Sequence, residues 1–255
     1  MPRRPVKPEQ KQKPKGRTPD AQAWIYGRHA AAAALQNPKR RIEKALATAN
    51  GAAWAAQAGA AASFQIVRSE EIEAALPAGA THQGLALLSP EPAQPDLDGA
   101  CAPATPSQPV VVLDQISDPQ NIGAIFRSAA AFGARAVIGQ DRRTPPLAGV
   151  LAKAAAGAVE RLPCVRVVNI SRTLKELKEM GYLIVGLAGQ SDTEIGDIPG
   201  DQPIALVLGA EGAGLRRLTR RDCDVLARIP IDAGVESLNV SNAAAVALYA
   251  LRCGR

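Results

Sequence analysis

Between residues 109 and 252, short apolar runs alternate with segments in which apolar residues recur every three or four positions. The run PVVVLDQ, residues 109–115, is continuous and β-branched, as in parallel strands that are buried on both faces. The segment after it is predicted to be a helix, because Asp118 can cap it, Pro119 suits the first helical position and Gly133 can end it. Further strands are predicted at 136–138, 182–188, 204–209 and 225–231, and further helices at 147–156, 170–180 and 239–252. This order predicts an open, mainly parallel α/β sheet with helices on both faces.

The chain before residue 109 shows the same alternation on a smaller scale. Strands are predicted within 24–26, 40–48, 63–67 and 82–88, and helices at 28–36, near 51–60 and at 69–76. This order predicts a compact α/β module over residues 23–89. Residues 90–108 contain five prolines and no apolar periodicity, which predicts a linker to a second module at 109–255.

One stretch, residues 47–67, carries no charged side chain and could suggest a membrane segment. It consists mostly of Ala and Gly, which are too weakly hydrophobic to span a bilayer. We expect a buried Ala-rich helix followed by a strand, and no association with a membrane. The N-terminus also lacks the apolar core of a signal peptide, so a cytoplasmic protein is expected.

The net charge of +6 is concentrated at the N-terminus. Residues 1–20 hold seven Lys or Arg residues, two acidic residues and five prolines. This composition predicts a disordered basic tail over residues 1–22. Such a tail suits a polyanionic partner, and a merely solubilising tail is the alternative.

The four cysteines, Cys101, Cys164, Cys223 and Cys253, lie far apart and form no CxxC pair. Neither zinc-site spacing nor a disulfide framework is present. We therefore expect small buried side chains in a reducing compartment, and no metal site.

The segment LVLGAEGAGL, residues 206–215, has the form of a strand that ends in a glycine-rich loop. Ligands bind at the carboxyl ends of strands in sheets of this class. Leu215 and Arg216 stand where a Walker phosphate loop needs Lys and Ser or Thr, and the dinucleotide motif GxGxxG is absent. Glu211 would also repel a phosphate. The loop therefore predicts a ligand without phosphate, and a glycine-rich turn without any ligand is the alternative.

Two further segments carry more polar groups than their helices need. Ser237, Asn239, Ser241 and Asn242 crowd the predicted start of the last helix, where one of them is enough as a cap. In DPQNIGAIFRS, Asn121 lies in the first helical turn, and Gly123 and Arg127 share a face. Both segments could surround a ligand. A cap with solvated neighbours, and a surface arginine, are the alternatives.

Together the segments 114–134, 206–219 and 229–249 resemble the three motifs of the SpoU branch of ribose 2′-O-methyltransferases, in the SPOUT superfamily. YGRHAAAAAL and HQGLAL, in the first module, resemble the L30e-like substrate-binding domain of many members. Residues 154–189 are similar to bacterial 23S rRNA guanosine 2′-O-methyltransferases.

The resemblance implies a catalytic domain with a deep trefoil knot, an exception to the usual avoidance of knots. It implies a homodimer with the active site near the subunit interface, and S-adenosylmethionine as the cofactor. The residues expected to hold that cofactor are Gly209, Ile229, Ile231 and Leu238. The expected partner is RNA, with 23S rRNA as the substrate.

By the same resemblance, catalysis is expected from Arg127, assisted by Asn121, Glu211, Ser237 and Asn239. A guanidinium with a pKa above about 12 is a poor proton acceptor. We therefore expect Arg127 to fix the neighbouring phosphate and to stabilise developing oxyanion charge. Three alternatives stay open: a tRNA methyltransferase of the same branch, a non-catalytic RNA-binding protein, and an α/β enzyme that uses another nucleotide.

Overall fold

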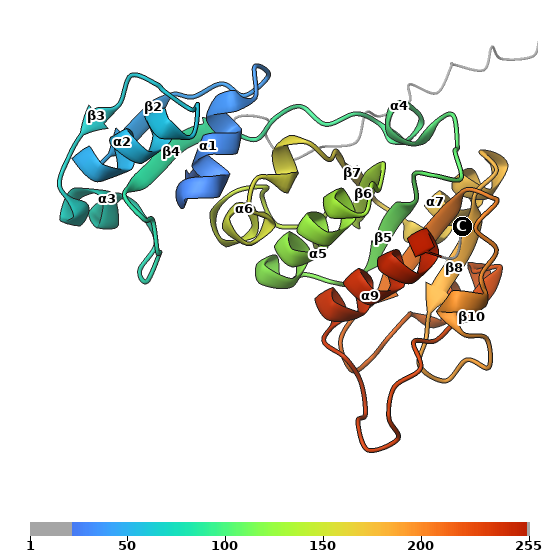
Figure 1. The fold of residues 1–255 in the computed structure, drawn as a ribbon. Coiled ribbons are helices and arrows are strands. Elements are labelled where there is room, and N and C mark those ends of the chain that lie inside the picture. Colours follow the sequence, from blue (N-terminus) through green and yellow to red (C-terminus); the bar gives the residue numbers. More distant parts are fainter. Residues whose placement is uncertain (1–21, 254–255) are drawn as a thin grey trace, which may run out of the picture.

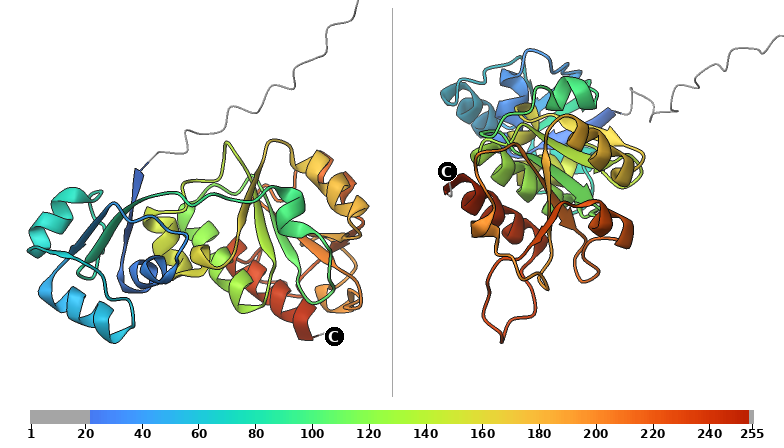
Figure 2. Two further views of the ribbon diagram at one scale, coloured as in Figure 1. Left: turned by 90° about the horizontal axis from the view of Figure 1, so that it is seen from above. Right: turned by 90° about the vertical axis from the view of Figure 1, so that its right-hand side faces the viewer.

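A computed structural model describes residues 22–253 as two α/β domains joined by an extended segment (Figure 1). The predicted basic tail lies outside the described residues, apart from Gln22, with which the first strand begins. Figure 2 shows the two domains side by side, with the larger sheet in the C-terminal one. The predicted domain boundaries, 23–89, 90–108 and 109–255, remain our proposal.

The N-terminal domain contains a mixed four-stranded sheet in the order β1-β4-β2-β3. Its strands are β1 (Gln22–Tyr26), β2 (Lys44–Ala47), β3 (Gln65–Ile66) and β4 (Leu85–Pro90), and its helices are α1 (Arg28–Gln36), α2 (Ala49–Gln57) and α3 (Ser69–Ala75). All seven predicted elements are present, several of them shorter than predicted. The Ala-rich helix α2 was expected to be buried, but only Gly51 and Ala55 are. At Gly51 the helix packs so closely against the residue before β4 that a Cβ would lie 2.1 Å from the Gly84 carbonyl oxygen.

The C-terminal domain contains a six-stranded sheet in the order β10-β8-β9-β5-β6-β7. Every pair of neighbouring strands is parallel, so the predicted parallel sheet is confirmed. The strands are β5 (Val110–Asp114), β6 (Ala136–Gln140), β7 (Cys164–Val167), β8 (Leu183–Leu187), β9 (Ile204–Gly209) and β10 (Val225–Ala227). The edge strand β7 was not predicted, because it is short and mixes polar with apolar residues.

Helices cover both faces of this sheet, because successive residues of a buried strand point to opposite faces. Val111 and Leu113 pack with α5 (Pro119–Ala131), α6 (Gly149–Ala155) and α9 (Val240–Cys253). Val110 and Val112 pack with α7 (Ile170–Glu179) on the other face. The short helix α8 (Arg217–Asp222), which was not predicted, contacts α7. As predicted, Asp118 caps α5 by accepting a hydrogen bond from the Asn121 backbone N–H at 2.7 Å.

The segment between the domains is more ordered than its prolines suggested. It forms one helical turn, α4 (Leu97–Cys101), whose Cys101 is buried. The Tyr182 hydroxyl donates to the Cys101 carbonyl oxygen at 2.8 Å, and Arg135 Nε donates to that of Ala100 at 2.8 Å. These bonds hold the segment against the larger domain.

One hydrophobic core continues from the N-terminal domain into the C-terminal one. It includes Ile25 and Ala34 from the first domain and Leu151 and Ala155 of α6 from the second. Beside it, Arg40 Nε lies 3.7 Å from Glu160 Oε1, with both side chains almost fully buried. Asn37 Nδ2 donates to the other Glu160 oxygen at 2.8 Å. The two domains are therefore joined by packing and by buried polar contacts.

The cysteines only partly follow the expectation. Cys101 and Cys164 are buried, Cys223 is half-buried, and Cys253 is exposed. The expectation is wrong for Cys253, which is exposed on the last turn of α9 in the described part of the chain. Within residues 22–253 no helix has the length and hydropathy of a membrane span, and no three His, Cys, Asp or Glu side chains gather as a metal site would require.

Candidate active site

The glycine-rich loop follows β9 and turns back on itself. A Cβ on Gly209 would lie 2.2 Å from the Gly214 carbonyl carbon, so position 209 has no room for a side chain. The Gly214 backbone N–H donates to the Ala210 carbonyl oxygen at 2.8 Å and closes the turn, and Gly214 has a φ of 64°. Only glycine adopts that angle readily. The turn places Glu211 at its exposed tip.

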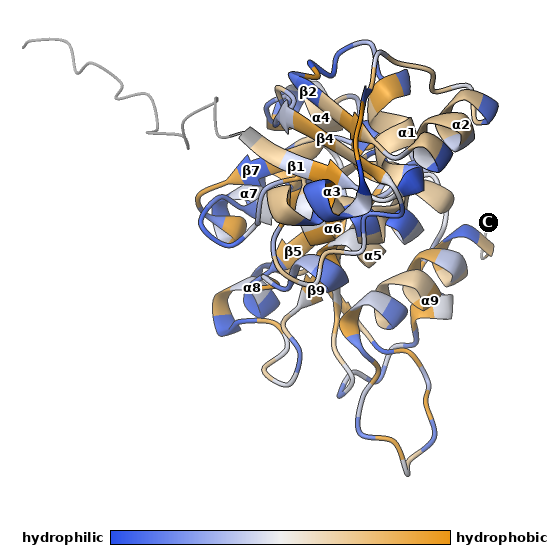
Figure 3. Cartoon of the chain, turned by 90° about the vertical axis from the view of Figure 1, so that its left-hand side faces the viewer, coloured by the Kyte–Doolittle hydropathy of each residue, from blue (hydrophilic) through white to orange (hydrophobic). Residues whose placement is uncertain are grey.

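A cavity of about 430 Å³ lies between this loop, the end of β8 and the segment before α9. That segment projects from the body of the domain and mixes polar with apolar residues (Figure 3). The cavity lining includes all four residues predicted to hold a cofactor: Gly209, Ile229, Ile231 and Leu238. Glu211 and Ser237 also line it.

Three predicted site residues form one hydrogen-bonded cluster at the edge of this cavity. Asn239 Nδ2 donates to Glu211 Oε1 at 2.6 Å and to Asn121 Oδ1 at 3.0 Å. The Val240 backbone N–H, at the start of α9, also donates to Glu211 Oε1, at 3.4 Å. The carboxylate thus faces amide donors and a helix N-terminus, where negative charge is favoured. Each member of the cluster comes from a different one of the three motifs.

The cluster leaves particular atoms available for a ligand. Asn239 is fully engaged, because its Oδ1 accepts from the Ser241 backbone N–H at 2.9 Å and from the Ser241 hydroxyl at 2.6 Å. Within residues 22–253, Glu211 Oε2 and Asn121 Nδ2 have no hydrogen-bond partner. One free acceptor and one free donor therefore flank the cavity, held in place by Asn239.

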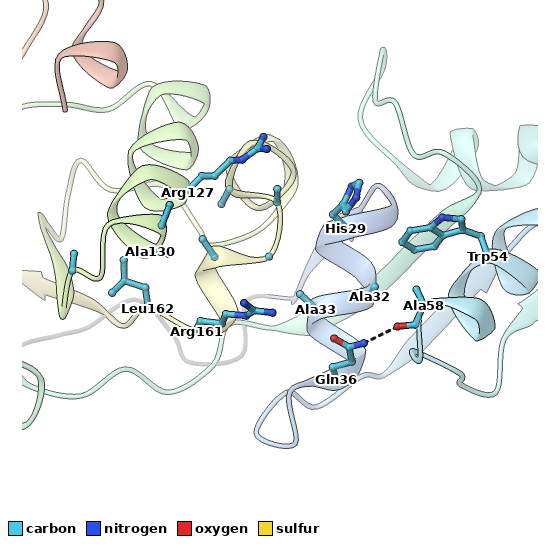
Figure 4. A pocket seen from close by; sticks show the side chains of 16 residues that line it. His29, Ala32, Ala33, Gln36, Trp54, Ala58, Arg127, Ala130, Arg161 and Leu162 are labelled. Atoms are coloured by element: carbon cyan, nitrogen blue, oxygen red, sulfur yellow. Dashed lines mark hydrogen bonds between the residues drawn. The ribbon is translucent and has the colours of Figure 1, made fainter. Parts of the chain in front are cut away.

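Arg127 is not part of this cluster. It is exposed on α5 and lines a second cavity, between the two domains, with residues of α1, α2 and α6 (Figure 4). Arg127 follows Asn121 by six residues, and 3.6 residues per turn put the two side chains on different faces of one helix. A single copy of the chain therefore brings together Asn121, Glu211 and Asn239, with Ser237 on the same cavity, but not Arg127.

One pair that supports the loop was not predicted. Asp114, at the end of β5, is fully buried, and its carboxylate accepts hydrogen bonds from Arg216 at the end of the glycine-rich loop. The signal in the sequence is a carboxylate that ends the apolar run VVVLD. The cavity is also lined by Arg220 and Glu236, which were not predicted.

Comparison with known families identifies both domains. The model of the SpoU rRNA methylase family matches residues 108–249, which is more than half of the chain. The chain belongs to the SpoU rRNA methylase family. A second family model, for RNA 2′-O ribose methyltransferase substrate binding, matches residues 24–95.

Curated relatives of this family member agree with that assignment. A 23S rRNA (guanosine-2′-O-)-methyltransferase RlmB from Coxiella burnetii is 50% identical over 140 residues, which are 55% of this chain and 56% of the relative. An uncharacterized tRNA/rRNA methyltransferase from Mycobacterium ulcerans is 45% identical over 169 residues, 66% of this chain and 54% of the relative. The chain thus spans about half the length of the curated relatives it matches.

Solved structures confirm the fold class of this SpoU family member. An RNA 2′-O ribose methyltransferase superposes with a TM-score of 0.77 at 26% identity, over 90% of this chain and 87% of that one. The SpoU methyltransferase AviRb from Streptomyces viridochromogenes, solved with AdoMet, gives 0.74 at 24% identity, over 90% and 89% of the two chains. The predicted SPOUT α/β fold with an N-terminal substrate-binding domain is confirmed, and the trefoil knot remains a prediction.

Proposed function

We propose that this protein methylates the 2′-hydroxyl of a ribose in RNA with S-adenosylmethionine as the methyl donor. The observation that carries the proposal is the hydrogen-bonded cluster of Asn121, Glu211 and Asn239 beside the cavity of about 430 Å³. It joins the three motifs of the SpoU family at one place. AviRb, which shares the fold, was solved with AdoMet.

The residues of the cavity suit this cofactor. Ile229, Ile231 and Leu238 offer apolar contacts for an adenine ring. The lack of space for a Cβ at Gly209 matches recognition by backbone groups. Glu211 and Glu236 outnumber Arg220 on the cavity wall, which suits a ligand with a positively charged sulfonium rather than a phosphate. S-adenosylmethionine, when bound there, supplies a methyl group already activated for in-line displacement.

The chain's own groups would orient the hydroxyl that attacks. We assign Glu211 Oε2 to accept a hydrogen bond from the ribose 2′-hydroxyl, and Asn121 Nδ2 to donate one to the ribose or its phosphate. Asn239 then acts as a positioning residue, since all of its polar side-chain atoms are engaged within the chain. Ser237 lines the same cavity and is assigned to the edge of the cofactor site. Alignment of this kind is a large part of the rate enhancement in such a transfer.

We retain Arg127 as the group that holds the adjoining RNA phosphate and stabilises developing oxyanion charge. Arg127 does not line the cofactor cavity of its own protomer. Its proposed role therefore depends on the homodimer, in which the Arg127 of one copy would act at the cofactor site of the other. An Arg127→Ala variant is expected to bind S-adenosylmethionine normally and to lose turnover. Methylation at the wild-type rate by this variant would exclude the role.

The homodimer is also part of the proposal. Val246 and Tyr249 are large, exposed hydrophobic side chains, 43% and 57% exposed, and both lie on α9, which packs against α5. A second copy of the chain is the occupant that we propose for this face. Sedimentation analysis is expected to give a dimer for the wild type and monomers for a Val246→Glu, Tyr249→Glu variant. A wild-type monomer would remove both the dimer and the proposed action of Arg127 across it.

A guanosine of 23S rRNA is the proposed substrate, because the relative named for that activity is 50% identical over the matched residues. Such a substrate places the activity in the cytoplasm. The test is calorimetric titration of S-adenosylmethionine, followed by tritiated methyl transfer to unmodified 23S rRNA, 16S rRNA and tRNA. We expect cofactor binding and label in 23S rRNA alone. Label in tRNA would instead favour the tRNA methyltransferase, and cofactor binding without transfer a non-catalytic RNA-binding protein.

A further inference from the structure

A cavity of about 530 Å³ lies between the two domains, and of its lining residues the proposed reaction uses only Arg127. Ligand sites commonly measure about 300–1,000 Å³, so its size suits a nucleotide. Figure 4 shows Arg127 and Arg161 on the C-terminal side of the cavity, with His29, Gln36 and Trp54 on the opposite side.

The charge of the lining is positive. Arg127 and Arg161 are both exposed, and within residues 22–253 neither side chain has an ion pair or a hydrogen bond. No aspartate or glutamate is among the lining residues described. The carboxylate of Glu160, next to Arg161 in sequence, is buried against Arg40 and Asn37. An anionic ligand would meet two free guanidinium groups and no opposing carboxylate.

The opposite wall presents an aromatic ring. Trp54 is half-buried, and the Arg28 guanidinium carbon lies 5.4 Å from its ring centroid. The His29 ring stands edge-on to it, with the two centroids 5.8 Å apart. Arg28 Nε is buried and has no hydrogen-bond partner within the described part of the chain. Proteins that bind single-stranded RNA combine such rings, on which bases stack, with cations that contact the backbone.

The cavity has fixed walls. Gly157, just after α6, has a φ of +93°, and a Cβ there would lie 2.7 Å from the Ala33 Cβ across the domain boundary. The close approach at Gly157 and the buried Arg40–Glu160 pair hold the two domains in one relative position. A ligand would therefore enter a preformed site, which keeps the ordering entropy of binding small.

We propose that the cavity between the domains binds an unpaired stretch of the RNA substrate, with its phosphates on Arg127 and Arg161 and one base stacked on Trp54. This inference rests on the proposed function, since it extends the same RNA strand from the phosphate held by Arg127 into the cavity. It makes Trp54 and Arg161 residues of the substrate-binding site. It also explains why the N-terminal domain, with few aromatic residues, places one of its two tryptophans at this boundary.

Tryptophan fluorescence of the full-length protein tests the site directly. The chain has two tryptophans, so a Trp24→Phe variant leaves Trp54 as the sole indole. Titration with a short single-stranded RNA is expected to quench its emission, while a duplex of the same length is expected to bind weakly, because its bases stay stacked. Unchanged emission at saturating single-stranded RNA would overturn the proposal.

Two substitutions separate stacking from charge. Trp54→Ala is expected to weaken binding of a fluorescein-labelled single-stranded RNA by roughly 5- to 100-fold, while Trp54→Phe retains most of the affinity. Arg161→Gln is expected to weaken binding and to reduce the slope of log K against log salt by about 0.7, the value for one phosphate contact on a single strand. Trp54→Ala should leave that slope unchanged.

Arg172→Gln is the matched control, because Arg172 is an exposed arginine on α7, which covers the other face of the sheet. It is expected to bind RNA as the wild type does. Wild-type affinity of both Trp54→Ala and Arg161→Gln would overturn the proposal even if methylation persists. S-adenosylmethionine affinity is measured in parallel. A chain that binds RNA in the cavity, but neither binds this cofactor nor transfers methyl groups, would refute the proposed function and leave the RNA site standing.

Discussion

Asp114 holds Arg216 at the far end of the glycine-rich loop by three contacts. Its Oδ2 accepts from the Arg216 backbone N–H at 3.0 Å, and its Oδ1 accepts from Nε at 2.7 Å and lies 2.7 Å from Nη2. The carboxylate is fully buried, whereas the arginine side chain is 45% exposed. The loop that carries Glu211 is thus anchored between the end of β9 and a buried charge at the end of β5.

Removal of the arginine side chain should disturb this anchor. Arg216→Ala leaves a buried carboxylate without its main partner, and breaking a buried pair destabilises a protein by about 3–5 kcal/mol. We expect a smaller effect, about 2 kcal/mol, because the arginine side chain is already 45% exposed to solvent. Urea unfolding gives this value, and calorimetry should show weaker S-adenosylmethionine binding. The control is Glu176→Gln, which removes an exposed pair with Arg172 and should change stability by less than about 1 kcal/mol.

Gly209→Ala should abolish cofactor binding. The added Cβ would lie 2.2 Å from the Gly214 carbonyl carbon, so the loop would have to open. Gly196 is not among the residues that line this cavity, and a Cβ there would meet nothing within 4 Å. Calorimetric titration should therefore show normal S-adenosylmethionine affinity for Gly196→Ala and no measurable binding for Gly209→Ala. Equal affinities of the two variants would mean that the cofactor lies elsewhere.

Asn239→Asp should make the reaction depend on pH in a new way. The substitution replaces a donor to Glu211 Oε1, 2.6 Å away, with a second carboxylate. Two carboxylates at this distance share a proton, so the pKa of the pair is raised. The rate should fall by about 100-fold at neutral pH through misalignment, and recover as the pH falls through that raised pKa.

Two variants serve as controls for this pH profile. Asn239→Ala should lose the same rate without recovery at low pH. Asn242→Asp, at an exposed position of the same helix start, should behave as the wild type does. A flat profile for Asn239→Asp would show that Asn239 does not position Glu211.

The sequence patterns predicted the buried strands well, because residues covered on both faces must be apolar. They did not predict β7, in which Arg166 interrupts the run and pairs with Glu91 at 2.5 Å. Glu91 lies in the predicted linker, so the residue that pairs with Arg166 is distant in sequence. The residues of β7 alone do not indicate that pair. Helix α8 was missed for a similar reason: four of its six residues are charged, and no apolar stripe marks it.

The sequence predicted the segments of the site separately, but it did not predict the hydrogen bonds that connect them. Short motifs indicated Asn121, Glu211 and Asn239, but the amide of Asn239 joins them only after α5, β9 and α9 have packed. The location of Arg127 depends on the rotation of α5 about its own axis and on what lies opposite. Its neighbour across the cavity, His29, is about a hundred positions away in the chain.

We expect the buried Arg40–Glu160 pair to stabilise the docked domains mainly because each buried charge faces its partner. Arg40 Nε, Arg40 Nη1 and Glu160 Oε1 have no hydrogen-bond partner among the described residues, and burial lowers the pKa of the Arg40 guanidinium. Removal of either charge alone leaves the other buried and unpaired, which should destabilise the protein by about 3–5 kcal/mol. The double variant Arg40→Met, Glu160→Met should be less destabilised than either single variant. Urea unfolding of the three variants measures this, and additive losses would exclude the coupling.

Alkylation of the cysteines should follow their burial. Burial raises the pKa of Cys101 to about 11 and the pKa of Cys164 and of Cys223 to about 12. At pH 8 a thiol with a pKa of about 11 is a thiolate in about one molecule in a thousand, and the thiolate is the reactive form. Cys253 lies one turn from Tyr249, on the face proposed for the dimer, so the monomeric Val246→Glu, Tyr249→Glu variant is the one to label. Iodoacetamide should label the exposed Cys253 of this variant first, and peptide mass spectrometry should find the other three cysteines unlabelled until the protein unfolds. A Cys253→Ser variant should remain unmodified under the same conditions. Rapid labelling of Cys164 in that variant would contradict its burial at the N-terminal end of β7.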